Sequence, residues 1–426
     1  MKTAANNNNI KYWVWLQKAI GRGARLASIL DAFPGGPEEI YWADDRERRM
    51  SGVFRSEAAL RRLNSRDFTE VYRVLTSCAK AGIDLLSPED RHYPEVFRAM
   101  EDLPAVIYAK GDLRLLNGSF PISVVGARRA SEDSRQTAAF LAQSLTKAGM
   151  LVVSGGALGI DSAAHTGAMS VGGKTVCILG SSLTEDYLKS NLPLRQAVSE
   201  QGVLLSEKAP GERYHPSDFP KRNRLIGALG MGTIVVQAGK DSGSLSTARR
   251  AADFGRDVFA VPAPAGAAGY EGGTALLEDG AIPCTSLQSV FDVYLTSGQS
   301  PEQLAEYRRQ LHPEALSEEL RTLSLSGGKL PDVPWELDSI QRERAEQRAR
   351  QEREKQLFLS RREAGPELSD RACQVYRCFA GPSLSLSELQ AMVPLTVNAL
   401  LGALSELEVF GYLVQQPDKT YNFTAS

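Results

Sequence analysis

The sequence predicts an α/β protein with a parallel sheet, because strand, glycine turn and helix follow one another twice between residues 121 and 167. The first apolar, β-branched run ends at Gly126, and apolar residues then recur at helical spacing until Gly149. A second run, residues 150–153, leads through a glycine-rich turn into another helix. Ligands of such sheets lie at the carboxyl ends of the strands, where backbone N–H groups and helix N-termini attract anions.

Basic and polar side chains occupy both turns. Arg128, Arg129 and Ser131 follow the first strand, and Ser154 and Gly155 follow the second. A single glycine turn is a weak signal, since many α/β domains need glycine there only to reverse the chain. Two arginines and a repeated arrangement favour a phosphate-bearing ligand.

The composition sets the broad class of protein. With 426 residues the chain has room for about three domains of ~100–200 residues each, and 42% hydrophobic with 23% charged residues is ordinary for a soluble globular protein. A net charge of −2 excludes a general polyanion binder, so any nucleic-acid affinity must come from a local basic patch. The five scattered cysteines indicate neither a zinc site nor a disulfide framework and favour the reducing cytoplasm. The apolar residues 12–16 are too short for a membrane span.

Residues 1–82 are expected to form a helical domain with turns at 21–23 and 34–37. The Gly-x-Gly turn is shared with helix-hairpin-helix modules, which present backbone N–H groups to DNA phosphates. A plain helical capping domain explains it equally well, so contact of these helices with DNA stays open. The α/β domain is expected over residues 83–295, starting with a small strand-containing bridge.

The α/β domain contains two further informative stretches. Lys221, Arg222, Asn223 and Arg224 begin a helix, with Phe219 just before them. Arginine suits phosphate, asparagine can bond a base edge and phenylalanine offers a stacking face; the alternative is a solvated basic turn with the phenylalanine in the core. Further on, Ser242 and Ser244 flank Gly243 at the start of another helix. This pattern is typical of an anion-binding helix N-terminus or of an ordinary helix cap.

Four segments together resemble the DNA-processing protein A (DprA, or Smf) family of bacteria. They are residues 125–131, 154–161, 219–224 and 242–248, within a likeness that covers about 83–292 strongly. The resemblance implies an extended Rossmann-like parallel sheet that binds single-stranded DNA (ssDNA), protects incoming DNA in natural transformation and loads RecA recombinase onto it. It also implies a homodimer joined through this domain, and no cofactor.

The candidate ssDNA site combines the basic turns with the family's motif positions. Its members are Arg128, Arg129, Ser131, Ser154, Gly155, Phe219, Lys221, Arg222, Asn223, Arg224, Ser242 and Ser244. The chain departs from the family pattern at Gln237, where glutamate is common, and at Ala263, where glycine is common. Both departures affect the detail of the pocket floor.

A nucleotide-binding or nucleoside-monophosphate-hydrolysing enzyme of similar fold is the alternative. Such an enzyme needs a placed acid or base, and the candidates are Asp161, Glu207 and His165. Asp161 is more simply a first-turn acid favoured by the helix dipole, and a lone histidine is more often a packing residue. We therefore expect a non-enzymatic protein.

Residues 296–365 are expected to be a linker, because they are rich in Ser, Pro and Gly and then in charge. From 366 to 426 the pattern of three helices and a β-wing turned at residues 417–419 predicts a winged-helix domain. No Lys or Arg occurs between Cys378 and Lys419, so its recognition helix would repel phosphates. This domain is expected to contact protein rather than DNA.

Overall fold

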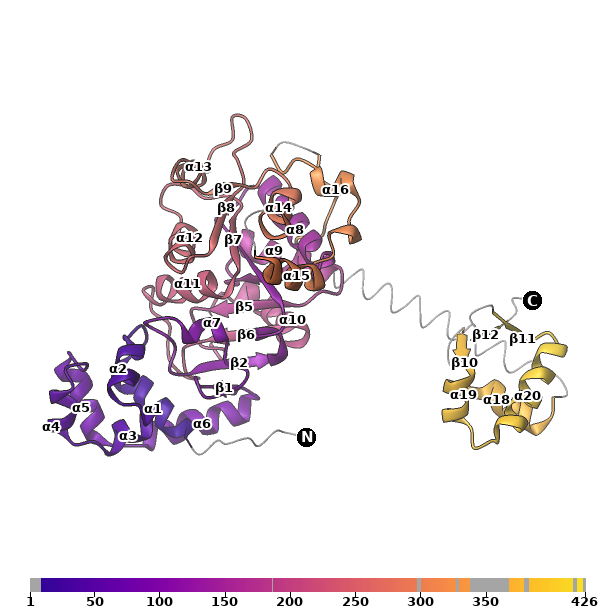
Figure 1. Ribbon diagram of the computed structural model, residues 1–426, viewed down its shortest axis with the longest axis horizontal. Helices are drawn as coiled ribbons and strands as arrows, with labels where there is room; N and C mark the ends of the chain where they lie inside the picture. The colour runs from indigo at the N-terminus through magenta and orange to yellow at the C-terminus, as the bar shows by residue number, and fades with distance from the viewer. Residues whose placement is uncertain are drawn as a thin grey trace. The chain divides into compact units, whose positions relative to one another are not determined.

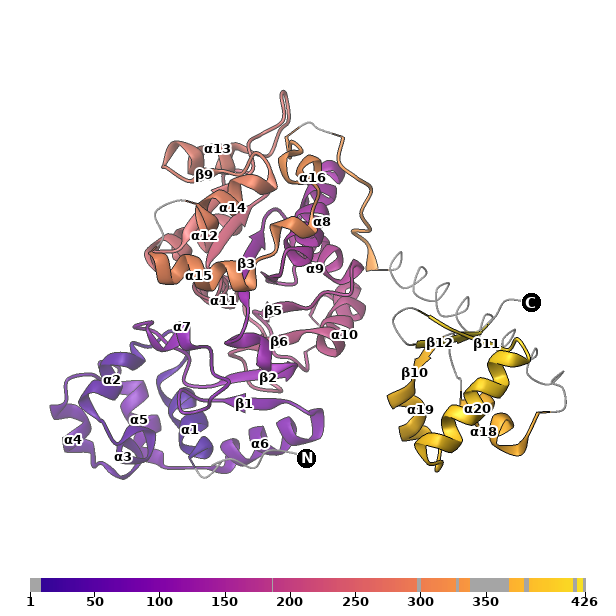
Figure 2. The same cartoon turned by 45° about the vertical axis from the view of Figure 1, so that its right-hand side comes forward.

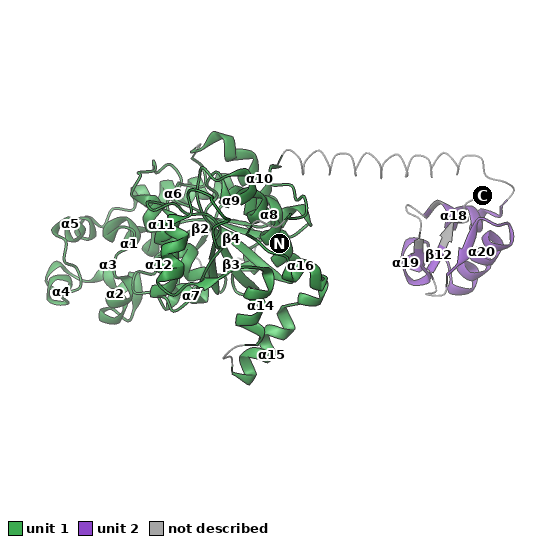
Figure 3. Cartoon of the chain, turned by 90° about the horizontal axis from the view of Figure 1, so that it is seen from above, with its two compact units in different colours: residues 1–340 green, residues 341–426 purple. Residues whose placement is uncertain are grey.

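The computed structural model describes residues 9–185, 187–296, 300–326, 329–337, 368–378, 383–416 and 420–423. The chain divides into two compact units, residues 1–340 and 341–426, which are coloured separately in Figure 3. Each unit is described by itself.

A nine-stranded sheet organises the first unit, in the order β1-β2-β6-β5-β4-β3-β7-β8-β9 (Figure 1). The strands from β6 to β9 in this order run parallel, while β1 and β2 are antiparallel to their neighbours. The bounds are β1 Asp84–Leu86, β2 Ile107–Gly111, β3 Phe120–Val125, β4 Met150–Ser154, β5 Thr175–Leu179, β6 Val203–Ser206, β7 Gly232–Val235, β8 Asp257–Ala260 and β9 Ile282–Pro283. The predicted parallel α/β core is confirmed.

The strand order reverses between β3 and β7. The chain adds β4, β5 and β6 outward on one side of β3, then crosses back and adds β7, β8 and β9 on the other side. Connections therefore leave β3 and β7 in opposite directions, which opens a crevice beyond their carboxyl ends.

Alternating strand residues supply two cores, one on each face of the sheet. Ile122, Val124 and Val152 pack under helices α8 (Glu132–Lys147), α9 (Ile160–Ser170) and α14 (Leu287–Leu295). Val125 and Val153 point to the other face, toward α11 (Asp218–Leu229) and α12 (Ser244–Asp253). Figure 1 shows α11 and α12 on one side of β7, with α8, α9 and α14 on the other.

The N-terminal helices pack against the same core as α11 and α12, near β1 and β2 (Figure 2). They are α1 Ile10–Ile20, α2 Leu26–Ala32, α3 Gly36–Trp42, α4 Asp45–Met50, α5 Glu57–Ser65 and α6 Thr69–Ala81. Val14 and Leu16 of α1 are completely buried. Gly21 and Gly23 have φ values of 80° and 76°, which side chains rarely adopt, so the predicted turn requires glycine.

Shorter elements complete the first unit. They are α7 Glu95–Arg98, η1 Leu113–Leu116, η2 Lys189–Asn191, α10 Leu192–Gln201 and α13 Glu271–Glu278. Of these, α10 packs on the sheet at β5 and β6, where Leu194 and Val198 form a small core with Cys177 and Leu204.

Part of the predicted linker belongs to the first unit. Residues after Ser300 form α15 (Pro301–Gln310), η3 (Pro313–Ala315) and α16 (Glu318–Thr322). Leu311, Leu316, Leu325 and Val333 are buried in the core under α8 and α14. The linker prediction was wrong for this stretch, because the average composition concealed a few apolar residues spaced so that each reaches the core. Residues 338–365, with the run of charge, lie outside the described residues.

The second unit contains, in chain order, α18 (Asp370–Cys378), β10 (Ser383–Ser385), α19 (Leu386–Met392), α20 (Val397–Val409), β11 (Leu413–Gln415) and β12 (Thr420–Phe423). The strands pair in the order β10-β12-β11, and Leu389, Leu400 and Leu407 form the centre of the core. The wing turn predicted at 417–419 lies outside the described residues. The winged-helix interpretation stays a prediction.

None of the helices in the described part of the chain is by itself long and apolar enough to cross a membrane. Helices α19 and α20 reach the required length and composition only when taken together, and they are bent by 113° at their junction.

Candidate functional site

A cleft of about 830 Å³ opens at the carboxyl ends of β3 and β7, where the strand order reverses. Its lining comes mainly from the turns after β3, β4 and β7, from the segments that carry Tyr187 and Tyr214, and from the first parts of α11 and α12. The side chains that carry polar or aromatic chemistry are Arg128, Arg129, Asp161, Tyr187, Tyr214, Phe219, Arg222, Asn223, Gln237, Lys240, Asp241, Ser242, Ser244, Ser246 and Thr247.

The turns that follow β3 and β7 touch each other at the floor of this cleft. The Ala127 N–H donates to the Gln237 carbonyl at 2.8 Å, and a Cβ at Gly126 would lie 2.9 Å from the same oxygen. Glycine is therefore required here by close backbone approach. This contact leaves Arg128 and Arg129 exposed at the mouth of the cleft.

Arg222 forms part of the cleft wall from an almost buried position. Its guanidinium donates to the carbonyls of Gly155, at 2.7 Å, and Ile178, at the ends of β4 and β5. A Cβ on Gly155 would lie 2.8 Å from this guanidinium, which explains the glycine. Burial lowers the pKa of Arg222, and nearby Asp161 opposes that shift. Arg222 thus ties α11 to the sheet.

Asp161 holds the glycine turn after β4. Its carboxylate accepts the N–H groups of Gly155 at 3.2 Å and Ala157 at 3.3 Å. Burial raises the pKa of this carboxyl, while Arg222 and the two N–H groups act in the opposite direction. The carboxylate is therefore already occupied by the backbone that it positions.

Three aromatic rings form a wall beside Arg128. The ring centroids of Tyr187 and Phe219 are 5.0 Å apart, and those of Tyr187 and Tyr214 are 4.4 Å apart. The Arg128 guanidinium lies 5.3 Å from the Phe219 centroid, a cation–π contact. Phe219 is half-buried against Gly180, so it belongs to the cleft and the packing at once.

Sequence reasoning missed Tyr187 and Tyr214, which form this aromatic wall together with Phe219. Each stands alone in an irregular segment with no motif around it. Glu185 brings the two segments together, because its carboxylate accepts the Tyr214 N–H at 3.0 Å. Arg195 of α10 donates to the carbonyls of Glu185 and Tyr187 from the other side.

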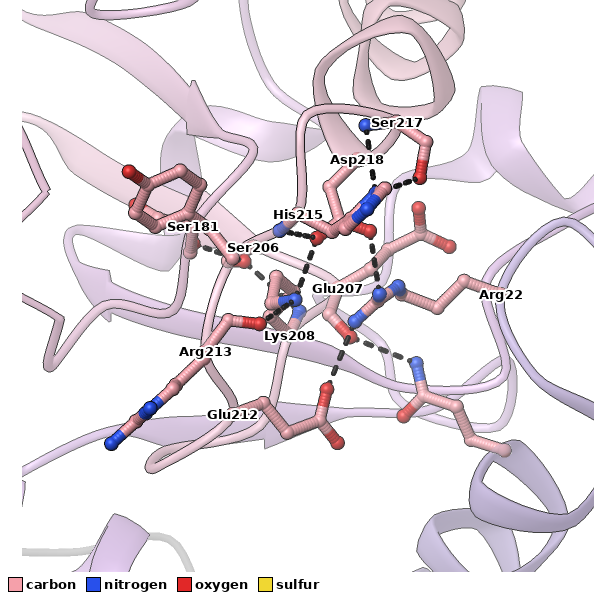
Figure 4. A network of polar contacts seen from close by, with 12 residues as sticks. Arg22, Ser181, Ser206, Glu207, Lys208, Glu212, Arg213, His215, Ser217 and Asp218 are labelled. Carbon is pink, nitrogen blue, oxygen red and sulfur yellow. Dashed lines mark hydrogen bonds and ion pairs between the residues drawn. The ribbon is translucent and has the colours of Figure 1, made fainter.

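A polar network fixes the loop between β6 and α11 that carries Tyr214 (Figure 4). Asp218, at the start of α11, accepts from Arg22 and Lys208, both at 2.7 Å, and from the His215 N–H at 2.7 Å. Arg22 also pairs with Glu212 at 2.9 Å. The arginine of the Gly-x-Gly turn is thus engaged in docking the N-terminal helices onto this loop.

The β7 side of the cleft is the start of α12. Ser242 and Ser244 are joined by their hydroxyls at 2.7 Å, and the Asn223 amide donates to the Gly243 carbonyl at 3.1 Å. The exposed Lys240 also lines the cleft. Lys240 was not among the predicted site residues, although its position in the turn between β7 and α12 could have identified it.

Not every predicted site residue reaches the cleft. Ser154 is buried and donates to the Val124 carbonyl at 2.6 Å, and Ser131 caps α8 through the Ser134 N–H at 3.2 Å. Gly155 lies beneath Arg222 and lines a small adjoining cavity. Ser131 and Ser154 are therefore structural in this fold, and we withdraw them as direct contacts.

Helix periodicity separates the basic residues of α11. Arg222 and Asn223 face the cleft, whereas Lys221 is exposed outside its lining. Arg224 is buried and pairs with Glu207 at 2.7 Å and Asp102 at 3.0 Å. We withdraw Arg224 as a direct contact, because successive side chains on a helix point about 100° apart.

Two of the three candidate catalytic groups lie elsewhere. His165 is buried, and its Nδ1 lies 2.8 Å from the Thr175 hydroxyl, which itself donates to the Val152 carbonyl. Burial lowers the pKa of His165 to about 3. Glu207 pairs with Arg224. Asp161 alone of the three lines the cleft.

The fold is that of a doubly wound α/β protein, and its large cleft lies at the switch point of the parallel sheet, where proteins of this class bind ligands. The chain belongs to the DNA recombination-mediator protein A family, whose family model matches residues 84–294. The resemblance seen in the motifs is confirmed.

Several relatives are named for DNA processing. The DNA processing protein DprA of Bacillus subtilis is 33% identical over 235 residues, which cover 55% of this chain and 79% of that protein. DprA of Streptococcus pneumoniae is 39% identical over 202 residues, 47% of this chain and 71% of that one. The crystal structure of DprA from Streptococcus pneumoniae matches with a TM-score of 0.58 at 31% identity, over 66% of this chain and 96% of that one. These similarities extend over the α/β domain of this chain, and the relatives that carry them are named for DNA processing.

Proposed function

We propose that this chain is an ssDNA-binding recombination mediator. It holds incoming single strands in the cleft, protects them and passes them to RecA recombinase during natural transformation. The observation that carries the proposal is the exposed Arg128 lying on the Phe219 ring, beside Tyr187 and Tyr214, at the switch point of the sheet.

The charge at the cleft mouth suits a phosphate backbone. Arg128, Arg129 and Lys240 are exposed there, and none of the three forms an ion pair with another described residue. Asp241 is the exposed acid of the lining. In a chain of net charge −2, such a local excess of cations is what attracts a polyanion.

The aromatic wall favours a single strand over a duplex. A base can stack on Tyr214 or Phe219 only if its face is free, whereas bases in a duplex are stacked on one another. Combined cations and aromatic rings are typical of proteins that bind single strands with little sequence preference.

The proposal is tested by binding of fluorescently labelled ssDNA and of duplex of equal length to the full chain. We expect clearly tighter binding of the single strand, and a loss of affinity when Arg128 is changed to alanine. Equal affinity for both forms, or no effect of Arg128→Ala, would contradict the assignment.

We also propose that the protein is not an enzyme, since Asp161 is committed to the turn that it holds. Incubation with nucleoside monophosphates should release no free base, and release with useful turnover would restore the hydrolase alternative.

We further propose a homodimer joined through the α/β domain, which would place two clefts on one strand. Sedimentation of the full chain as a monomer at micromolar concentration would count against the dimer.

A further inference from the structure

A row of four aromatic rings runs across the N-terminal helical domain, far in sequence from the cleft residues. It consists of Trp42 and Tyr41 at the end of α3, with Phe68 and Tyr72 at the start of α6. Neighbouring ring centroids lie 5.1 Å apart for Trp42 and Tyr41, 4.9 Å for Tyr41 and Phe68, and 6.1 Å for Phe68 and Tyr72. We call this set the aromatic row.

The aromatic row continues from the core to the surface. Tyr12 and Trp15 of α1 are buried behind Tyr41, with centroids 5.2 Å and 5.1 Å from its ring. The outer members are open to solvent, since Trp42 is 63% exposed and Tyr72 is 56% exposed. Large rings that are packed on a core and exposed at the ends of the row offer faces on which bases can stack.

One cation lies on a ring of the aromatic row, since the Arg66 guanidinium is 5.8 Å from the Tyr41 centroid. A second cation, the Lys11 ammonium, is 4.9 Å from the centroid of Tyr12, behind the row. Arg66 has a φ of 46°, a left-handed conformation that is strained for this residue type. Its guanidinium donates to the carbonyls of Trp42 and Ala43 at 3.1 and 2.8 Å, which keeps it against the row.

Some of the acidic side chains near the aromatic row already have hydrogen-bond or ion-pair partners within the protein. Asp67 accepts the Thr69 N–H at 2.8 Å, and Glu70 pairs with Arg73 at the exposed side of α6. Glu38 lies near Tyr12 and contributes to the raised pKa of that phenol, after burial. The aromatic row therefore combines exposed ring faces with the cation of Arg66, and Lys11 lies close behind. Rings and cations together are the pairing by which proteins hold the bases and phosphates of single strands.

We propose that the aromatic row is a second single-strand site, on which bases of the bound ssDNA stack over Trp42 and Tyr72. This inference rests on the proposed function, because the aromatic row and the cleft bind the same ligand. The aromatic row is a different surface from the Gly-x-Gly turn that the sequence offered as a DNA contact. Arg22 of that turn is already held by Asp218 and Glu212.

The test uses the full chain and an oligothymidylate of about 40 nucleotides, longer than the ~4–16 that one single-strand site covers. Trp42→Ala and Tyr72→Ala should each weaken binding about five- to a hundred-fold, the range expected for loss of one base stack. Met50→Ala is the matched control, because Met50 is 75% exposed on the same domain but outside the row, and it should bind as the parent does.

Tryptophan fluorescence separates the two sites. Emission should be quenched by the oligothymidylate in the parent and in Arg128→Ala, and the quenching should disappear in Trp42→Ala. If Arg128→Ala weakens binding and neither Trp42→Ala nor Tyr72→Ala has an effect, the aromatic row is not a single-strand site and the cleft remains the binding site. The reverse result would support the row and contradict the cleft. Unchanged ssDNA affinity together with altered sedimentation of the row variants would identify a protein interface and also overturn the proposal.

Discussion

Arg224 and Glu207 form an ion pair of 2.7 Å inside the first unit, although Arg224 stands in the basic segment that begins α11. Only 4% of the Arg224 side chain is exposed. Burial raises the pKa of Glu207, and Arg224 acts against that shift. The pair joins α11 to the end of β6, so this arginine supports the fold that carries the cleft.

Arg224→Ala is expected to destabilise the protein by about 3–5 kcal/mol, because it leaves a buried carboxylate without its partner. Urea unfolding measures the effect. Lys221→Ala, one turn away and exposed, should change the free energy of unfolding by less than ~0.5 kcal/mol. An Arg224→Ala protein that is as stable as the parent but loses ssDNA would return this residue to the site.

Lys240 and Lys221 test the lining of the cleft. Lys240→Ala should lower ssDNA affinity and reduce the slope of log affinity against log salt by ~0.7, the value for one lost phosphate contact. Lys221→Ala should leave that slope nearly unchanged, since Lys221 lies outside the lining. Titrations of each variant with ssDNA at several salt concentrations measure these slopes. Equal effects of the two changes would argue for a binding surface wider than the cleft.

Substitutions of Tyr214 separate the loss of base stacking from the loss of packing inside the protein. It is 42% exposed, so Tyr214→Ala should cost roughly 1–3 kcal/mol of ssDNA binding with little loss of stability. Tyr214→Phe keeps the ring and should bind nearly as the parent does. Phe219→Ala should lose both binding and stability, because Phe219 also packs on Gly180. If Tyr214→Ala bound ssDNA normally, the aromatic wall would have no part in recognition.

His165 makes stability depend on pH. Its pKa falls from 6.5 to about 3 in the folded chain, first through burial and then through Arg222. Between these values the unfolded chain binds the extra proton, so stability is lost as pH falls below 6.5, by up to about 1.4 kcal/mol per pH unit. His165→Asn removes this titration and should flatten the acid side of the stability curve. Curves of identical slope would show that His165 is not the responsible group.

Removal of residues 366–426 should leave ssDNA and duplex affinity unchanged. In the second unit Val397 and Leu401 on α20 are exposed with Val409 and Phe410 at its end, and no Lys or Arg occurs between residues 378 and 419. An apolar surface without cations suits protein contact rather than phosphate. A tenfold loss of affinity, ~1.4 kcal/mol, would refute this prediction.

The sequence by itself determined the parallel sheet, the glycine turns after β3 and β4, and the family. These features are local: β-branched runs, glycines where backbones approach closely, and motifs read along the chain. The switch-point cleft follows almost directly, since the turns after parallel strands share one edge of the sheet. Arg128, Arg129, Phe219, Arg222, Asn223, Ser242 and Ser244 were placed in its lining from the sequence alone.

Only the tertiary structure decided which of the remaining residues face that cleft. Arg222 and Arg224 look equivalent in sequence, yet the packing of α11 turns one toward the cleft and the other toward Glu207. Tyr187 and Tyr214 are brought together by Glu185 and Arg195 across long sequence separations. Residues 300–326 and 329–337 join the core through scattered apolar side chains, four of which are buried. In each case the deciding interaction is between residues distant in the chain, which local patterns do not record.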